Sequence, residues 1–317
     1  MSRVQVFRRL LTTAEIGQIF NSWQQEWALP ASCFTALPKA LSPGIISMSA
    51  QKPGREFAGV QYSFTESTGR AGGHSNGWID QPSYLNDGLH PDTQYAYQLK
   101  VRDVYGNVFI VSEAMTASTR LDQFTTFAPD FSVAHDFLAQ GVAGTSWSGL
   151  VKDGQGGVLE TVAATNGMLR LQSRGTVWDG GAARGPFLYQ TVSGDFVVQV
   201  NVADYAGLAN RQAVGSDDGG LMVRLPATGR SENLVALSFF PPWNQGNMLT
   251  SMTKGGRRQK GNLLGFNAKR YLQIIRAGSK VHFRVSNNGQ DWTEMPESPL
   301  NRPDFLNKPL QVGLGFV

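Results

Sequence analysis

The feature that most constrains the fold of this chain is the strict alternation of apolar and polar residues in short runs. Within residues 94–103, four apolar side chains recur at every second position: Tyr95, Tyr97, Leu99 and Val101. A period of two places them on one face of a β-strand. Comparable runs lie at 44–50, 57–65 and 107–114 and recur from 158 onward, with Gly, Pro, Asn and Asp between them. The sequence therefore predicts an all-β protein built of packed sheets.

The composition supports this fold class and indicates the number of domains. With 317 residues the chain exceeds one ordinary domain of about 100 to 200 residues, so two domains are expected. Charged residues make up 16% of the chain, which also holds 36 Gly and 15 Pro. That balance is typical of many short strands joined by turns, and we expect helix in less than about a tenth of the chain.

Residues 8–22 are the one segment with convincing helical periodicity, and Thr13 with Glu15 suits a helix start. The pattern R-x-L-[ST]-x-x-E-I-x-x-[LIF] in this segment resembles the tail of a laminin-G-like jelly roll. The resemblance implies that residues 1–39 are a short N-terminal helix and linker that remain from a preceding domain.

The segment DGLHPDTQYAYQLKVRDVYGNV at 87–108 resembles the signature of fibronectin type III domains. The core pattern L-x-P-x-T-x-Y-x-[YF] is matched by Leu89, Pro91, Thr93, Tyr95 and Tyr97. The resemblance implies a fibronectin type III-like sandwich over residues 40–120. A tyrosine of this kind can tie a corner of the sandwich through its hydroxyl.

Three later stretches resemble successive parts of the concanavalin-like family known as DUF1349. They are GPFLYQTVSGDFVVQVNV at 185–202, DDGGLMVRL at 217–225 and VHFRVSNNGQDWTEM at 281–295. The family pattern is matched in order, although Gly185 stands where Ala is usual and Asn288 where Asp is usual. The resemblance implies a concanavalin A-like jelly roll over residues 121–317.

Alternation within these stretches also predicts which side chains point into the core, because a slip of one residue would invert every side chain. The residues expected to point inward, unlike their immediate neighbours, are Phe196, Val198, Val200, Leu221, Val223 and Phe283.

Enzymatic chemistry finds little support in the residue pattern. Glycoside hydrolysis needs two carboxyl groups across the scissile bond, and the string E-x-D-x-x-E that concanavalin-like glucanases use does not occur in the sequence. Nucleophilic catalysis needs a His within reach of a Ser or Cys. His282 alternates with apolar neighbours, which predicts an exposed position in a sheet, and Cys33 has no motif around it. A glycoside hydrolase therefore stays as an alternative only.

Carbohydrate binding needs flat aromatic faces for stacking and polar side chains that bond sugar hydroxyls. The predicted ligand-binding residues are Trp178, Asp179, Arg224, Trp243, Asn244 and Gln245. The two tryptophans stand in the loop sequences RGTVWDGG and FFPPWNQGN, and the arginine is expected on the concave sheet. Trp147 and Tyr205 are further aromatic candidates, whereas Trp292 in the NGQDWT turn is expected to pack in the core common to the family it resembles. For each of the other tryptophans ordinary core packing is an equal alternative.

Calcium stays open as a ligand, because relatives of such folds often carry it and hard cations bind loop oxygens. The run GSDDGG would supply Asp217 and Asp218, although a solvated turn is the preferred interpretation. No other cofactor is expected. In the first domain, the glycine-rich loop 69–87 contains Trp78, which either binds a ligand or covers the end of the sandwich.

The charge pattern bears on partners and location. The net charge is +4 and the basic residues are spread out except for Lys254, Arg257, Arg258 and Lys260, so we expect no nucleic-acid partner. No apolar run is long enough to span a membrane, and residues 1–30 lack a signal peptide. The chain stops inside an apparent strand, so we expect a piece of a longer secreted or cell-surface protein, of a kind common in bacteria. Separately, we expect it to be a monomer.

Three functions remain open at this point. The first is a non-catalytic region that binds polysaccharide or another glycan. The second is a structural spacer or adhesion module without such a ligand. The third is the glycoside hydrolase alternative.

Overall fold

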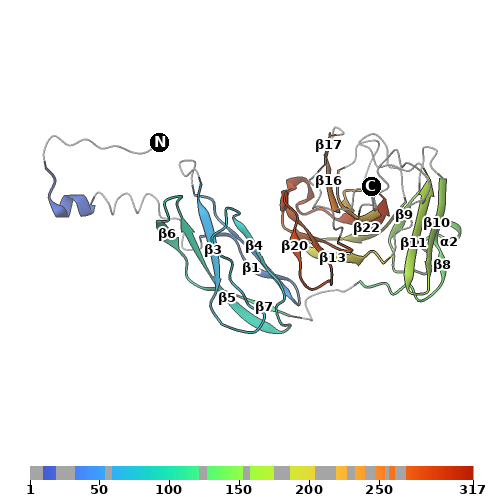
Figure 1. Ribbon diagram of the computed structural model, residues 1–317, viewed down its shortest axis with the longest axis horizontal. Helices are drawn as coiled ribbons and strands as arrows, with labels where there is room; N and C mark the ends of the chain where they lie inside the picture. The colour runs from blue at the N-terminus through green and yellow to red at the C-terminus, as the bar shows by residue number, and fades with distance from the viewer. Residues whose placement is uncertain are drawn as a thin grey trace. The chain divides into compact units, whose positions relative to one another are not determined.

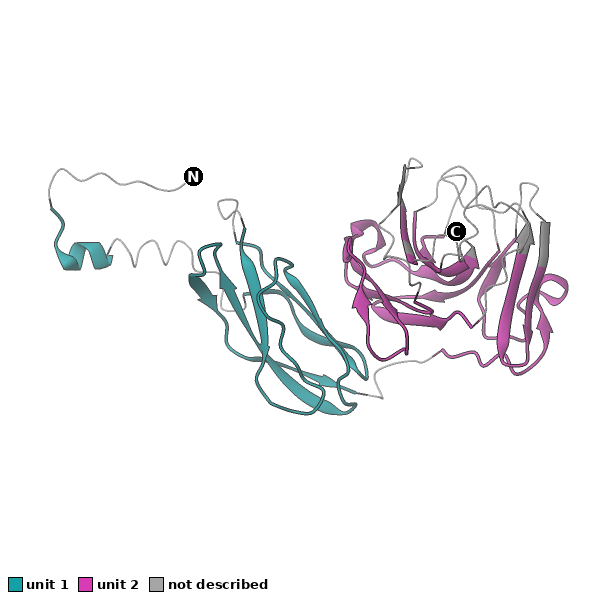
Figure 2. Cartoon of the chain, in the orientation of Figure 1, with its two compact units in different colours: residues 1–125 teal, residues 126–317 magenta. Residues whose placement is uncertain are grey.

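The computed structural model describes residues 10–18, 33–53, 59–120, 127–152, 158–174, 186–203, 219–226, 233–239, 247–253, 257–260 and 269–316. The chain forms two compact units, residues 1–125 and 126–317, which Figure 2 shows in separate colours. Among the described residues, strands make up 52% and helices 6%. The predicted all-β class and low helix content are therefore confirmed.

Unit 1 is a β-sandwich of two antiparallel sheets. One sheet has the order β1-β2-β4, and in the other β5 pairs with β3, β6 and β7. The strands are β1 (Phe34–Ser42), β2 (Ile45–Ala50), β3 (Gln61–Glu66), β4 (Ser83–Asn86), β5 (Thr93–Arg102), β6 (Val108–Val111) and β7 (Met115–Thr119). This arrangement agrees with the expected fibronectin type III-like sandwich. Its first strand begins at Phe34, six residues before the N-terminal limit of 40 that the sequence indicates.

The core of unit 1 follows the alternation of β5. Tyr95, Tyr97, Leu99 and Val101 are fully buried beside Tyr62 and Phe64 of the neighbouring strand β3. Ile46 and Met48 of the opposite sheet belong to the same core. The Tyr95 hydroxyl donates to the Ala71 carbonyl at 2.7 Å and accepts from the His90 backbone N–H at 2.9 Å. This residue ties the loop before β4 to the chain before β5, as the sequence pattern predicts for a corner tyrosine.

Unit 2 is built on a seven-stranded antiparallel sheet in the order β17-β16-β15-β14-β22-β12-β9. Figure 1 labels β17, β16, β22 and β9 of this sheet. Its strands are β9 (Gly149–Val151), β12 (Phe187–Val192), β14 (Gly219–Arg224), β15 (Leu234–Phe239), β16 (Asn247–Thr253), β17 (Arg257–Lys260) and β22 (Leu310–Phe316). Every neighbouring pair is in regular antiparallel register. The register fixes which residues share each face of the sheet.

Two smaller sheets cover one face of this large sheet. The first contains β13 (Phe196–Asn201), β18 (Tyr271–Ala277), β19 (Lys280–Ser286), β20 (Thr293–Glu294) and β21 (Leu300–Asn301). The second contains β8 (His135–Asp136), β10 (Val158–Thr165) and β11 (Met168–Arg174). The short helix α2 (Phe137–Gln140) packs against β10 of this sheet. A 3₁₀ turn, η2 (Pro303–Phe305), precedes β22. Unit 2 is therefore a second β-sandwich, and its membership of the concanavalin-like family stays a prediction.

The main core of unit 2 lies between the large sheet and the β13-β18-β19 sheet. Phe196, Leu221, Val223 and Phe283 are buried in it, and Val198 and Val200 pack against it. The predicted inward orientation of these six residues is confirmed. The expectation that β14 is only half-buried is wrong, however, because Met222 and Arg224 on the opposite face are also buried.

The N-terminal helix is described over residues 13–18 only. The Thr12 backbone N–H donates to the Glu15 carboxylate at 2.9 Å, and the Glu15 N–H donates to the Thr12 hydroxyl at 3.3 Å. These reciprocal bonds form a capping box, which makes Thr12 the N-cap and not Thr13. The link to a laminin-G-like domain stays a prediction.

Candidate ligand-binding face

The candidate site is the face of the seven-stranded sheet that points away from the main core, which we call the Arg224 face. The register places Gly220, Met222 and Arg224 of β14 on this face, since Leu221 and Val223 point into the core. Their cross-strand neighbours extend the face over β12, β15, β16 and β22: Phe187, Tyr189, Leu234, Ala236, Ser238, Thr250, Gln311, Gly313 and Gly315.

Arg224 is the charged centre of this face. Its side chain is only 5% exposed, and its Nε donates to Gln311 Oε1 on β22 at 2.7 Å. Its guanidinium carbon lies 5.4 Å from the centre of the Phe187 ring. A buried arginine held by an amide and an aromatic ring is fixed in direction, so it can recognise a polar group with little loss of side-chain entropy.

In the middle of the Arg224 face stand glycines, so no side chains project from the sheet there. Gly220 lies opposite Gly315, and Gly313 lies opposite Met222. A Cβ at Gly313 would stand 1.9 Å from the Leu188 carbonyl oxygen, so the strands approach closely here and no side chain fits. Beside Arg224 the surface of the sheet is therefore formed by the backbone of Gly220, Gly313 and Gly315, which we call the glycine floor.

Two stacked aromatic rings border this floor on β12. The rings of Phe187 and Tyr189 lie 5.5 Å apart with an interplanar angle of 21°. Phe187 is fully buried, whereas Tyr189 is half-buried and lies over Gly149, where a Cβ would meet its hydroxyl at 2.4 Å. Among the described aromatic residues of this face, Tyr189 is the partly exposed one, and sequence reasoning missed it.

Most of the residues predicted to bind a ligand lie outside the described part of the chain. These are Trp178, Asp179, Trp243, Asn244 and Gln245, together with the calcium candidates Asp217 and Asp218 and the aromatic candidate Tyr205. Arg224 alone among the predicted ligand residues is described. Trp147 belongs to the core, where its ring stacks on Phe131 at 6.2 Å, so the core interpretation holds for that tryptophan.

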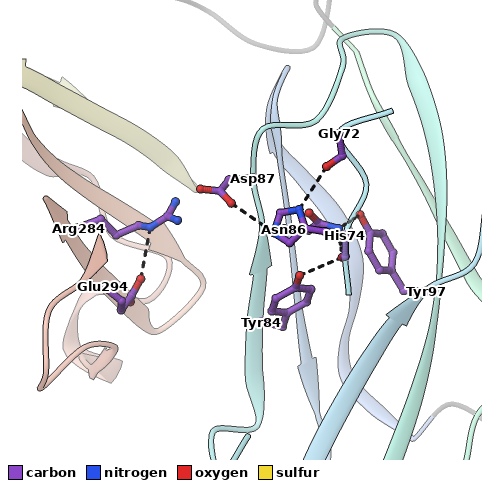
Figure 3. A network of polar contacts seen from close by, with 8 residues as sticks. All are labelled: Gly72, His74, Tyr84, Asn86, Asp87, Tyr97, Arg284 and Glu294. Atoms are coloured by element: carbon purple, nitrogen blue, oxygen red, sulfur yellow. Dashed lines mark hydrogen bonds and ion pairs between the residues drawn. The ribbon is translucent and has the colours of Figure 1, made fainter. Parts of the chain in front are cut away.

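Glu294 on β20 is the centre of a separate polar cluster. His282 Nδ1 lies 2.8 Å from Glu294 Oε1, Arg284 Nε lies 3.5 Å from Oε2, and the Ser298 hydroxyl donates to the same carboxylate; Figure 3 draws the Arg284–Glu294 pair. The prediction of an exposed His282 is wrong, because β20 pairs with β19 and holds Glu294 against the imidazole. The cluster contains one carboxylate, whereas glycoside hydrolysis uses two.

In unit 1, the predicted glycine-rich loop 69–87 is a loop only as far as residue 82, because Ser83–Asn86 form β4. A polar network fixes this shorter loop (Figure 3). The His74 carbonyl accepts from the Tyr84 hydroxyl at 3.0 Å and from Asn86 Nδ2 at 2.7 Å. Asn86 Nδ2 also donates to the Tyr97 hydroxyl at 3.0 Å. Burial raises the pKa of Tyr97, so its hydroxyl stays protonated. The loop is thus held by structural bonds to β4 and β5.

Trp78 of this loop lies against Arg102 of β5, whose guanidinium carbon is 4.4 Å from the ring centre. Arg102 also donates through Nε and Nη2 to Gln61 Oε1 at 2.9 and 2.6 Å. One face of the indole is therefore occupied by a fixed cation, which favours the interpretation that Trp78 covers the sandwich.

Among the described residues, no group of three or more His, Cys, Asp or Glu side chains is placed to hold a metal ion. Within the same ranges, no helix combines the length and apolar character needed to cross a membrane.

Comparison with protein-family models and with curated proteins gives no match. Among solved structures, the chain is similar to a two-domain fibronectin type III segment of chicken tenascin, with 12% identity over 84% of this chain and 99% of that chain. The TM-score of 0.19 means that the two chains do not superpose as wholes. The description of each unit therefore rests on its own strand pairing.

Proposed function

We propose that the chain is a non-catalytic glycan-binding region of a secreted or cell-surface protein, and that the Arg224 face of unit 2 is its binding site. The observation that carries the proposal is the buried Arg224–Gln311 pair beside a glycine floor and the half-buried Tyr189. A sugar ring stacks on an aromatic face while fixed polar groups bond its hydroxyls.

A second function, a structural or adhesion module, is favoured by unit 1. In its sandwich, hydrogen bonds from Tyr84 and Asn86 of β4 hold the loop before β4, and Arg102 covers Trp78. Such a unit is suited to spacing or protein contact. In this proposal unit 1 is the spacer that carries unit 2, so the structural function and the glycan-binding function coexist in one chain.

A glycan array with the whole chain separates the candidate functions. Specific binding that is reduced in the Arg224→Met variant supports the proposal, because methionine keeps the buried volume and removes the donors. If the folded parent binds no glycan on the array, the result supports the spacer function alone. Release of reducing ends from an incubated polysaccharide would support the hydrolase and contradict the proposal.

A further inference from the structure

An asparagine followed by a glycine is the sequence step at which a protein chain most readily modifies itself. The backbone nitrogen of the glycine attacks the side-chain amide carbon of the asparagine, because no side chain shields that nitrogen. The chain contains three such steps: Asn76–Gly77, Asn166–Gly167 and Asn288–Gly289. All three lie within the described ranges, and their backbone surroundings differ.

Two of the three glycines are held by the fold. The Gly167 N–H donates to the Phe131 carbonyl at 3.1 Å, and the Gly289 N–H donates to the Ser286 hydroxyl at 3.0 Å. Both glycines have positive φ angles, 77° and 74°, which their turns require. An N–H that already donates must break its hydrogen bond before its nitrogen can attack, so these two steps are protected.

Gly77 is not held in this way. Its N–H donates to none of the residues that the structure describes. The residue is exposed, its φ angle lies outside the left-handed region, and a Cβ at this position would meet nothing within 4 Å. Neither space nor backbone conformation requires a glycine here. The nitrogen of Gly77 is therefore open to reaction and accessible to water.

The side chain of Asn76 is arranged as the electrophile of this reaction. Its Oδ1 accepts from the Phe64 N–H at 2.6 Å, and a donor at this oxygen stabilises the negative charge that develops there when the amide carbon is attacked. Its Nδ2 is buried and bonds to no described residue, so no hydrogen bond retains this group when it leaves. At Asn288, by contrast, Nδ2 donates to Asp291 Oδ2 at 2.7 Å.

We propose that Asn76 is a site of self-modification, at which the Asn76–Gly77 step closes to a succinimide and opens to isoaspartate or aspartate. The Gly77 nitrogen bonds to the amide carbon of Asn76 and gives its proton to solvent base. The bond from that carbon to Nδ2 breaks, and Nδ2 takes a proton from solvent and leaves as ammonia. Water then opens the ring: attack at the main-chain carbonyl gives isoaspartate, and attack at the former side-chain carbonyl gives aspartate.

The modified residue would lie where the loop closes the edge of β3. This strand is at the edge of its sheet, and the loop bonds to it at two points. The Asn76 N–H donates to the Phe64 carbonyl at 3.3 Å, and Ile79 exchanges two backbone hydrogen bonds with Tyr62 at 2.7 and 2.9 Å. Isoaspartate adds one carbon atom to the main chain between these points, so both sets of bonds cannot keep their register. The modification therefore frees backbone groups at the edge of β3.

Peptide mass spectrometry of the whole chain, incubated at mildly alkaline pH, compares the three steps within one protein. Isoaspartate is identified by methyl transfer from an isoaspartyl methyltransferase. We expect Asn76 to convert at least about fivefold faster than Asn166 or Asn288, the factor that one hydrogen bond of about 1 kcal/mol on the attacking nitrogen gives. In the urea-unfolded chain the three rates should converge. Comparable rates in the folded chain, or the same preference in the unfolded chain, overturn the proposal.

The variant Gly77→Ala tests the attacking nitrogen without disturbing the fold. Its methyl group has room, so the variant should melt with the parent and convert at Asn76 several-fold more slowly. Hydrogen exchange at the Phe64 amide tests the consequence for β3: it should be faster in the isoaspartate fraction of aged parent and unchanged in aged Gly77→Ala. Conversion of the folded variant at the parent's rate overturns the assignment of Gly77, and unchanged Phe64 exchange in the isoaspartate fraction overturns the opening of the edge.

Discussion

Arg224 and Gln311 lie directly opposite each other on β14 and β22, and the Arg224 Nε donates to Gln311 Oε1 at 2.7 Å. Both side chains are buried, so each depends on the other for part of its hydrogen bonding. This pair is the polar centre of a face whose other described members are largely apolar or small.

The first prediction concerns the coupling within this pair. Arg224→Met leaves Gln311 Oε1 without its donor, and Gln311→Leu removes the acceptor of Nε, so each single variant should lose about 1–3 kcal/mol of unfolding free energy. The double variant should lose clearly less than the sum of the two. Urea unfolding of the parent, the two single variants and the double variant measures this coupling. Strictly additive losses of unfolding free energy would show that the two side chains are not coupled.

The second prediction concerns the register of β13. Val198 packs against the main core, whereas Asn201 of the same strand is exposed on the opposite face. Val198→Asp buries a carboxylate among apolar side chains and should cost unit 2 about 3 kcal/mol or more, while Asn201→Asp should stay within about 0.5 kcal/mol of the parent. Thermal unfolding of both variants checks this, and equal melting temperatures would mean that the register is wrong.

The third prediction concerns the corner tyrosine of unit 1. Tyr95→Phe removes the hydroxyl that bonds Ala71 O and His90 N and should destabilise unit 1 by about 1–2 kcal/mol. Tyr105→Phe is the control, because the Tyr105 side chain is 87% exposed. If both variants unfold at the same denaturant concentration as the parent, the corner bonds contribute nothing to stability.

The fourth prediction concerns acid sensitivity of the β5–β6 turn. The Asn107 side chain and the backbone N–H groups of Asn107 and Tyr105 donate to Asp103, and these bonds hold the pKa of its carboxyl below the usual value. A depressed folded pKa contributes stability above the unfolded pKa, and this stability is lost as the pH falls through the folded pKa. Asp103→Asn should therefore lose less stability than the parent between neutral and acidic pH. An equal loss in urea unfolding at the two pH values would contradict this.

The alternation of the sequence predicted the strand faces because a side-chain period of two is a local property. It placed Tyr95, Tyr97, Phe196 and Leu221 in the cores correctly. It could not show that the second face of β14 is buried, because burial depends on what covers a face and not on its period. His282 was placed wrongly for the same reason, since Glu294 reaches it from another strand.

The candidate site was only partly visible in the sequence. The motif GLMVR identified Arg224, but Gln311 is 87 residues away and becomes its neighbour only through the pairing of β14 with β22. One local signal was available: in LQVGLGF, Gln311, Gly313 and Gly315 alternate with apolar residues, which marks a strand with one nearly bare face.

Calorimetric titration of a glycan selected on the array into the parent, Arg224→Met and Arg170→Met measures the role of the Arg224 face most directly. Arg170 is the matched control, because it donates to Gln172 Oε1 at 3.1 Å on an exposed strand of the same unit. We predict that Arg224→Met weakens binding about tenfold or more and that Arg170→Met leaves it unchanged. Equal affinity of the folded Arg224→Met variant and the parent would contradict the assignment of this face as the binding site.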